Sequence, residues 1–349
     1  MKASPVGTVL PHPLVPPTIP AASGVSPTRD YAIFGGCLRS EIPLPELPVI
    51  EKCARPDWVF RRARGPLPSS QYLGEDSVDA TIRVRCGRLD GGFRLDFDDT
   101  GVFDISDGGR DIAWTPDAVE RLELVRADLL GGVFSVALHL QGLLCLHGSA
   151  VAVGPVALAF LANKGSGKST LATAMCAAGA TLVTDDMLPL HPASPVTAWP
   201  SMPAIRLLHD SAVHLRHATG PTHPATGKYH VNALPDEQVE RRRLPLDAIY
   251  ELAPVPAGPG VAPVQRIRVK GAAAVATLLR HNRAGTAIGG AESANLFVRA
   301  SDIVRTTPVY RLEIARDFDR LADVVDQIGR WHSAVDSAGA ESSATAAAQ

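Results

Sequence analysis

Apolar and polar residues alternate along much of the chain between residues 30 and about 115. The runs ATIRVRC (80–86), GGFRLDFDD (91–99) and GVFDISD (101–107) show this period of two, with Gly and Asp residues between them. Alternation interrupted by turn residues predicts β-strands. No convincing catalytic constellation occurs in this part, so we expect a small β-rich N-terminal domain over residues 30–115.

The pattern changes to helical spacing between Pro116 and Gly142, with acidic residues early in the run and the glycine after its end. These end signals predict a helix. Two apolar runs follow, at 143–153 and 155–162, and a small turn at Gly154–Pro155 separates them. Their composition predicts two strands joined by that turn.

A glycine-rich loop follows the second of these strands. After the loop, STLATAMCAAGA (169–180) is predicted to be a helix that ends at Gly179, and TLVTDD (181–186) to be a short buried strand. Strand, loop, helix and strand in close succession form the nucleotide-binding unit of α/β proteins. We therefore predict an α/β fold class, with one domain over residues 116–333.

The two ends of the chain show no periodic pattern. Residues 1–29 are rich in Pro, Ser and Ala, and residues 334–349 have a similar composition. Such segments bury too little apolar surface to offset the entropy lost on ordering. We predict a disordered, Pro-rich arm at 1–29 and a disordered tail at 334–349.

The composition is that of a globular protein: 46% of the 349 residues are hydrophobic, and the mean hydropathy is +0.07. A net charge of -2 without a long basic block argues against nucleic acid or an acidic membrane as a partner. Apolar runs break well before the roughly 20 residues of a spanning helix, and we expect a cytoplasmic location. The cysteines lack CxxC spacing and are interpreted as reduced thiols, neither a disulfide framework nor a metal site: Cys37, Cys53, Cys86, Cys145 and Cys176.

The loop reads ANKGSGKS from Ala162 to Ser169, which matches the phosphate-binding pattern except for its first glycine. Alanine is tolerable there if its φ stays negative. The remaining glycines let backbone N–H groups converge on an anion at a helix N-terminus. Lys168 is expected to bridge the β- and γ-phosphates, and Ser169 to offer its hydroxyl to Mg²⁺. The predicted nucleotide-binding residues are Asn163, Lys164, Gly165, Ser166, Gly167, Lys168, Ser169 and Thr170.

Asp185 and Asp186 end the strand that follows the loop helix, where an acid beside a phosphate-binding loop holds Mg²⁺. We assign Asp185 to the metal, together with Ser169, and Asp186 to the base that takes the proton of an attacking hydroxyl. The reverse assignment stays open. His147 is a candidate catalytic residue that steadies Asp186, with a purely structural histidine as the alternative. Lys168 is also predicted to be catalytic, because it neutralises charge on the transferred phosphoryl group.

The segment KGSGKS (164–169) resembles the variant loop of the ParA/MinD ATPases, whose extra lysine reaches a partner subunit. That family carries its loop near the N-terminus, whereas this loop lies in the middle of the chain. A solvated surface lysine is therefore our interpretation of Lys164.

Three elements in order resemble the HPr kinase/phosphorylase family: His147-Gly148 at the start of a strand, the loop NKGSGKST, and the Asp185-Asp186 pair. HGSA before the loop and DD after it are also similar to phosphoenolpyruvate carboxykinase, a fold relative of that family. The matching core covers about residues 140–190. The resemblance implies a P-loop core of the HPr-kinase/phosphoenolpyruvate-carboxykinase type, preceded by the β-rich domain.

Further segments are similar to the broader group of HPr-kinase-related proteins, which includes the kinases that phosphorylate lasso-peptide precursors. By that resemblance Lys228 and Arg206 are further candidate phosphate contacts, with a solvated cation as the alternative for each. The segments are WPSMPAIRLLHDSA (199–212), GKYHVNA (227–233), RLPLDAIYEL (243–252) and TTPVYRLEIARDFDRL (306–321).

Together these features predict an ATP- and Mg²⁺-dependent kinase that transfers the γ-phosphoryl group to a hydroxyl. The expected acceptor is a serine of a small protein or of a ribosomal, lasso-type precursor peptide. Two alternatives stay open: a nucleotide-gated regulatory protein with slow hydrolysis and no acceptor, and a kinase of a sugar or other small metabolite. A homo-oligomer is also left open.

Overall fold

The computed structural model describes residues 28–333, apart from 78–81, 164, 203, 208–210, 212–214, 216–228, 232–233 and 259. The predicted tail and residues 1–27 of the predicted arm lie outside the described residues. Strand β1 (Arg29–Ile33) already begins at the last position assigned to the arm, because Arg29 pairs with Ser40. The strand thus overlaps the predicted arm by one residue.

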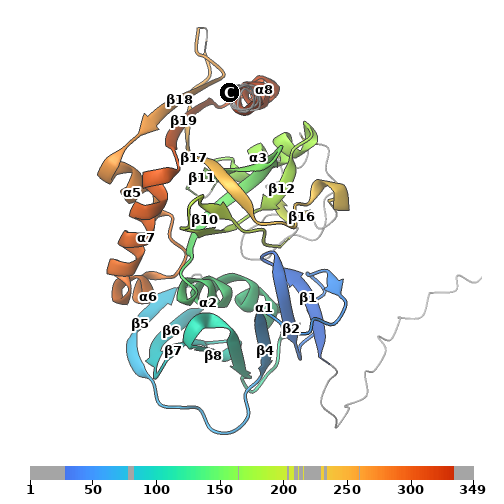
Figure 1. Cartoon of the computed structure of the whole chain (residues 1–349), viewed down its shortest axis with the longest axis vertical. Helices are drawn as coiled ribbons and strands as arrows, with labels where there is room; N and C mark the ends of the chain where they lie inside the picture. The colour runs from blue at the N-terminus through green and yellow to red at the C-terminus, as the bar shows by residue number, and fades with distance from the viewer. Residues whose placement is uncertain are drawn as a thin grey trace, which may run out of the picture.

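The first sheet contains nine strands in the order β3-β1-β2-β4-β9-β8-β7-β6-β5, and it lies in the lower half of Figure 1. The three alternating runs of the sequence form strands, as predicted; these strands pair antiparallel, and every second residue of β8 is buried. After β1, the strands are β2 (Gly36–Ser40), β3 (Val49–Ile50), β4 (Trp58–Arg62), β5 (Gln71–Ser77), β6 (Arg83–Leu89), β7 (Gly92–Phe97), β8 (Gly101–Ser106) and β9 (Asp111–Thr115).

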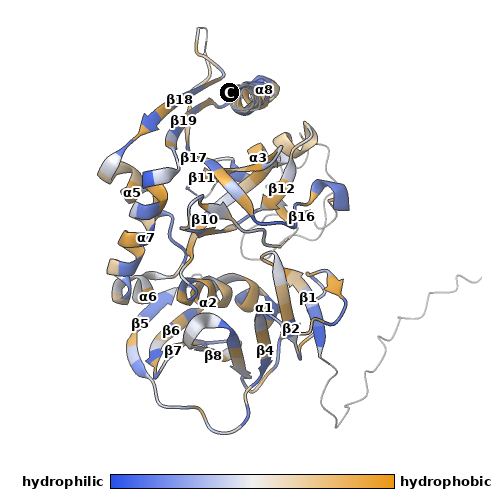
Figure 2. Ribbon diagram, in the orientation of Figure 1, coloured by the Kyte–Doolittle hydropathy of each residue, from blue (hydrophilic) through white to orange (hydrophobic). Residues whose placement is uncertain are grey.

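The helical run after this sheet is broken into three pieces: α1 (Leu122–Asp128), a π-helical turn η2 (Leu129–Val133) and α2 (Phe134–Leu140). The helix starts at Leu122, later than its pattern predicts, and the π-helical turn contains the pair Gly131-Gly132. Helix α2 is apolar along most of its length, as Figure 2 shows. Its Phe134 packs edge-on against Phe34 in the turn between β1 and β2, with ring centroids 5.1 Å apart. The core of the first sheet therefore includes helices from beyond residue 115.

Asp128 is the last residue of α1, and its partly buried carboxylate accepts a hydrogen bond of 2.6 Å from the Thr100 hydroxyl. Burial raises the pKa of Asp128 to about 7, from an ordinary value of 3.8. The folded chain therefore holds this proton more tightly than the unfolded chain. The stabilisation is complete below about pH 4 and is lost as the pH rises through 7.

Asp128→Asn is therefore expected to stabilise the protein at pH 8, by on the order of 2 kcal/mol, and to have little effect near pH 4. The amide oxygen can still accept the Thr100 hydroxyl, and it carries no charge to desolvate. Urea unfolding at both pH values measures the difference, with the exposed strand residue Asp111→Asn as the control. An equal effect of Asp128→Asn at both pH values would contradict the explanation.

The second sheet contains eight strands, and five of them close a circuit, because β11 pairs with β17 as well as with β10. The circuit runs β11-β10-β13-β14-β17, and β19 and β18 extend it; β12 pairs with β10. Strands β15 (Ile205–Leu207) and β16 (Tyr229–Val231) form a separate pair. The bounds are β10 (Leu144–Val153), β11 (Val156–Leu161), β12 (Thr181–Thr184), β13 (Met187–His191), β14 (Thr197–Ala198), β17 (Leu244–Val255), β18 (Val264–Val269) and β19 (Val309–Ala315).

Helices cover both faces of the second sheet. Successive residues of β11 point to opposite faces, so they contact different helices. Ala159 and Leu161 pack toward α5 (Gly271–Arg280) and α7 (Ser293–Thr306), whereas Leu158 and Phe160 pack toward α3 (Lys168–Ala177) and α8 (Leu321–Ser333). Figure 1 shows α5 and α7 along one side of this sheet. The remaining short helices are η1 (Asp107–Gly109), η3 (Asp236–Gln238), α6 (Thr286–Ala291) and η4 (Phe318–Arg320).

The fold is thus mixed α/β, with two large sheets. The predicted strands at 143–153 and 155–162, the turn between them, the helix after the loop and the strand after that helix are all confirmed. None of the described helices is both long and apolar enough to cross a membrane. The glycine-rich loop lies where β11 ends and α3 begins, and this placement sets the geometry of the site.

Candidate functional site

The loop from Ala162 to Gly167 joins β11 to the N-terminus of α3. Gly165 and Gly167 adopt φ values of +82° and +93°, which favour glycine. Among the described residues other than glycine, only Phe34 and Asp186 have a positive φ, so Ala162 keeps a negative one. The alanine therefore fits this loop without backbone strain. Lys164 lies outside the described residues.

Lys168 is the first residue of α3, and only 7% of it is exposed. Its Nζ donates a hydrogen bond of 2.7 Å to the carbonyl oxygen of Ala162 and lies 3.5 Å from that of Asn163. The backbone N–H of Ser166 donates a hydrogen bond to the same carbonyl of Asn163 and so forms a turn. The ammonium group thus folds back over the loop, at the positive end of the helix.

The acidic pair occupies the connection between β12 and β13, two strands that both pair with β10. Asp185 is buried, and its Oδ1 accepts hydrogen bonds from the hydroxyls of Ser149, at 2.5 Å, and Ser169, at 3.0 Å. Ser149 lies on β10 and Ser169 in the first turn of α3. Asp185 and Ser169, which the sequence assigns to one metal site, therefore do lie together.

The neighbouring carboxylate of Asp186 faces a different set of partners. One oxygen lies 3.2 Å from Nδ1 of His147, and the other 3.1 Å from a guanidinium nitrogen of Arg283. Arg283 also approaches the His147 ring, at 3.3 Å. Asp186 has a φ of +87°, an uncommon conformation outside glycine that Asp and Asn tolerate better than most residues. Strain of this kind is concentrated at functional sites.

Arg283 is the functional candidate that the sequence does not reveal. It lies in the loop between α5 and α6, far from the acidic pair along the chain, and belongs to no motif. Backbone hydrogen bonds place this loop against β10: Arg283 N donates to Cys145 O, and His147 N donates to His281 O. Ser149 falls within the segment HGSA, but its residue type alone does not predict a contact with Asp185.

Gly148, between His147 and Ser149, has no room for a side chain. A Cβ atom there would lie 2.7 Å from Leu161 Cδ2 and 2.9 Å from the carbonyl oxygen of Phe160. Glycine therefore lets β10 lie close to the strand that carries the loop. The two neighbours of Gly148 point to the two aspartates, so the spacing of β10 and β11 affects both halves of the site.

Gly148→Ala is expected to destabilise the protein by about 1–3 kcal/mol, the usual cost of overpacking. Thermal unfolding measures this loss. Gly290→Ala is the matched control, because Gly290 is exposed on α6 with no atom near the position of a Cβ. A Gly148→Ala protein as stable as the Gly290→Ala protein would show that β10 and β11 can separate without penalty.

A cavity of about 340 Å³ adjoins the loop on the side of α8. The loop residues Gly165, Ser166 and Gly167, together with Thr170, form one wall, and the ends of β17 and β19, η4 and α8 form the other. The hydroxyl of Thr170 lies 2.8 Å from that of Ser211 at the edge of the cavity. The opposite wall is largely apolar, with Leu252, Phe318, Leu321 and Val324, and also contains Arg316 and Asp317.

The side chains of two predicted phosphate-binding residues lie outside the described part of the structure. Lys228 lies outside the described residues. The backbone of Arg206 belongs to β15, opposite His230 of β16, but its side chain is outside the described part of the structure. Both assignments stay predictions.

Comparison with known proteins adds little to this geometry. No family model and no curated protein matches the chain. Among solved structures, the chain is similar to the HPr(Ser) kinase/phosphatase from Coxiella burnetii, at 12% sequence identity and a TM-score of 0.30; the match covers 55% of this chain and 98% of that chain. A TM-score this low carries no argument about function, which has to be inferred from the site itself.

Proposed function

We propose that this protein is a kinase that uses Mg·ATP and transfers the γ-phosphoryl group to a hydroxyl. The observation that carries the proposal is the different surroundings of two adjacent carboxylates beside a glycine-rich loop. Asp185 faces two hydroxyls, one of them from the loop helix, whereas Asp186 faces His147 and Arg283. Such a pair can divide two tasks, with one carboxylate holding the metal and the other accepting the proton of the acceptor hydroxyl.

The oxygens around Asp185 suit Mg²⁺, a hard cation that prefers carboxylate and hydroxyl ligands. Asp185 and Ser169 would hold the ion, and Ser149 is placed to orient the Asp185 carboxylate through its hydrogen bond. When bound, Mg²⁺ offsets the negative charge of the phosphates. The chain thus supplies a carboxylate and a hydroxyl as possible Mg²⁺ ligands on one side of the loop.

The loop supplies the positive groups on its other side. Backbone N–H groups around Gly165 and Gly167, at the N-terminus of α3, can bind a polyphosphate. Lys168 would exchange its present bond with the Ala162 carbonyl for phosphate oxygens. The cavity beside Thr170, with its apolar wall on η4 and α8, would take the nucleoside. Fixed charges and dipoles of this kind lower the barrier to phosphoryl transfer, because they stabilise the charge that develops in the transition state.

Asp186 would accept the proton of the attacking hydroxyl. His147 and Arg283 contact different oxygens of its carboxylate, so they hold its plane in one orientation. Arg283 also adds a positive charge next to the reacting groups. We propose it as a catalytic residue in addition to Lys168, Asp186 and His147.

The acceptor we propose is a serine of a small protein or of a ribosomal, lasso-type precursor peptide, by the resemblance of the sequence motifs to HPr-kinase-related proteins. The test is transfer of label from γ-labelled ATP to a peptide library with serine, threonine or alanine at one position. Label on the serine peptides and none on the alanine peptides is expected. Label on sugars alone would favour a small-molecule kinase, and release of phosphate without any transfer would favour a nucleotide-gated regulator.

A further inference from the structure

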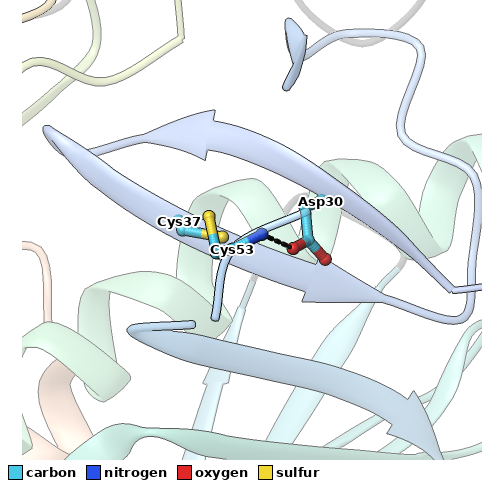
Figure 3. Close-up of side chains that lie close together, drawn as sticks. All are labelled: Asp30, Cys37 and Cys53. Atoms are coloured by element: carbon cyan, nitrogen blue, oxygen red, sulfur yellow. Dashed lines mark hydrogen bonds between the residues drawn. The ribbon is translucent and has the colours of Figure 1, made fainter. Parts of the chain in front are cut away.

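The first sheet brings together two cysteines, neither of which belongs to the proposed kinase site. The sulfur atoms of Cys37 and Cys53 and a carboxylate oxygen of Asp30 lie within 4.8 Å of one another. Figure 3 shows the two sulfur atoms side by side. Cys37 lies in β2 and is buried, whereas Cys53 lies in the loop after β3 and is partly exposed.

Hydrogen bonds fix the main chain at both cysteines. Cys37 N donates to Asp57 Oδ2 at 2.9 Å, and Cys53 N donates to Asp30 Oδ2 at 2.7 Å. The carbonyl oxygen of Cys53 accepts from Arg39 at 2.7 Å. The main chain is thus held at both cysteines while their sulfur atoms lie close together, and such an arrangement raises the effective concentration of the two thiols for each other.

A metal ion fits this cluster less well than a bond between the sulfurs. The guanidinium of Arg39 donates to both oxygens of Asp30, each at 2.9 Å, so a divalent cation would meet a positive charge at its carboxylate ligand. Burial, and then the nearby Cys53 thiol, raise the pKa of Cys37 to about 12. A thiol must lose its proton both to bind metal and to attack a disulfide, so the raised pKa slows both reactions, and the pairing of Asp30 with Arg39 is what disfavours the metal.

We propose that Cys37 and Cys53 are a modification site at which a reversible disulfide forms by exchange with a low-molecular-weight disulfide such as oxidised glutathione. The partly exposed Cys53 thiolate attacks one glutathione sulfur and expels the other as a thiolate. Cys37 then gives up its proton to water, attacks Cys53 Sγ and expels the second glutathione thiolate. The two protein thiols lose two electrons and two protons, which reduce oxidised glutathione to two thiols.

The Cys37–Cys53 disulfide would stabilise the part of the first sheet that contacts the second sheet. Cys37 follows the turn of the β1–β2 hairpin, where the carbonyl oxygen of Phe34 accepts a hydrogen bond of 3.0 Å from Arg243. The Arg243 guanidinium lies 3.5 Å from the ring centroid of Trp199, which directly follows β14 of the second sheet. Closing a loop between residues 37 and 53 restricts the unfolded chain, so oxidation is expected to raise the Tm by a few degrees.

The test uses the full chain, reduced, freed of reductant and then equilibrated with glutathione buffers of increasing oxidising strength. Trypsin cleaves after Arg29 and Arg39, which releases peptide 30–39 with Cys37. It also cleaves after Lys52 and Arg61 but not at the Arg55-Pro56 bond, which releases peptide 53–61 with Cys53. The cross-link therefore joins these two peptides. Mass spectrometry is expected to show this linked pair, two hydrogens lighter than the separate peptides, and to lose it when reductant is added.

Cys53→Ala is expected to abolish the linked pair, whereas the matched control Cys86→Ala keeps it, because Cys86 is a buried cysteine outside the cluster. Because Cys53 is the more exposed partner, its variant should fold even if a Cys37 variant does not. Peptide 53–61 carrying glutathione without any link to 30–39 would overturn the proposal. Protection of both thiols by one bound Zn²⁺, measured by metal analysis of the reduced chain, would also overturn it and assign a metal site.

Discussion

Asp186→Asn is expected to lower phosphoryl transfer by roughly 10²- to 10⁴-fold, the usual contribution of a general base, while Mg·ATP binds almost as tightly as to the parent. The amide keeps the size of the carboxylate, and asparagine tolerates the positive φ of this position. What it loses is the ability to accept a proton. Single-turnover transfer and calorimetric binding measure the two effects separately.

Asp185→Asn is expected to fail in a different way, with weaker Mg·ATP binding and lower transfer together. Its carboxylate faces the hydroxyl of Ser169, so the lost charge is the one that would hold the metal. Asp302→Asn, on the exposed surface of α7, is the control for replacing an acid by its amide. Exchanged phenotypes would reverse the two roles and keep the kinase. If neither variant differs from the parent, the acidic pair is only a turn between two strands.

Lys168→Ala is expected to reduce phosphoryl transfer below detection. Its ammonium donates to the carbonyl of Ala162, at the start of the loop that we propose to bind the phosphates, so the variant removes a positive charge from that loop. Because Lys168 is buried, some stability will also be lost, so a melting curve has to show that the variant is folded at the assay temperature. The control is Lys52→Ala, which replaces an exposed lysine in the loop after β3. Parent-like turnover in folded Lys168→Ala would remove the proposed nucleotide site.

The sequence predicts the local structure around the loop because that structure depends on near neighbours. Strands β10, β11 and β12 are short apolar runs, helix α3 directly follows the glycine-rich loop, and glycines lie at the adjoining turns. The order of His147, the loop and the acidic pair follows from their chain positions. Their meeting at one end of the sheet follows from the pairing of β10 with β11, β12 and β13.

Contacts between distant segments leave no such pattern. Arg283 reaches Asp186 because the segment after α5 pairs its backbone with β10, and nothing near position 283 indicates that pairing. The cavity wall on η4 and α8 comes from the far end of the chain for the same reason. The periodic run after residue 116 predicts a helix but not its late start, its π-helical turn or its packing on the first sheet.

The most direct test of the proposed site is a calorimetric titration of the parent chain with ATP, once with Mg²⁺ and once with a chelator. We predict saturable binding of one ATP per chain with Mg²⁺, much weaker binding with the chelator, and loss of binding in folded Lys168→Ala. Binding that is indifferent to both Mg²⁺ and Lys168, or no binding of ATP at all, would contradict the assignment of the loop and its acidic pair to Mg·ATP.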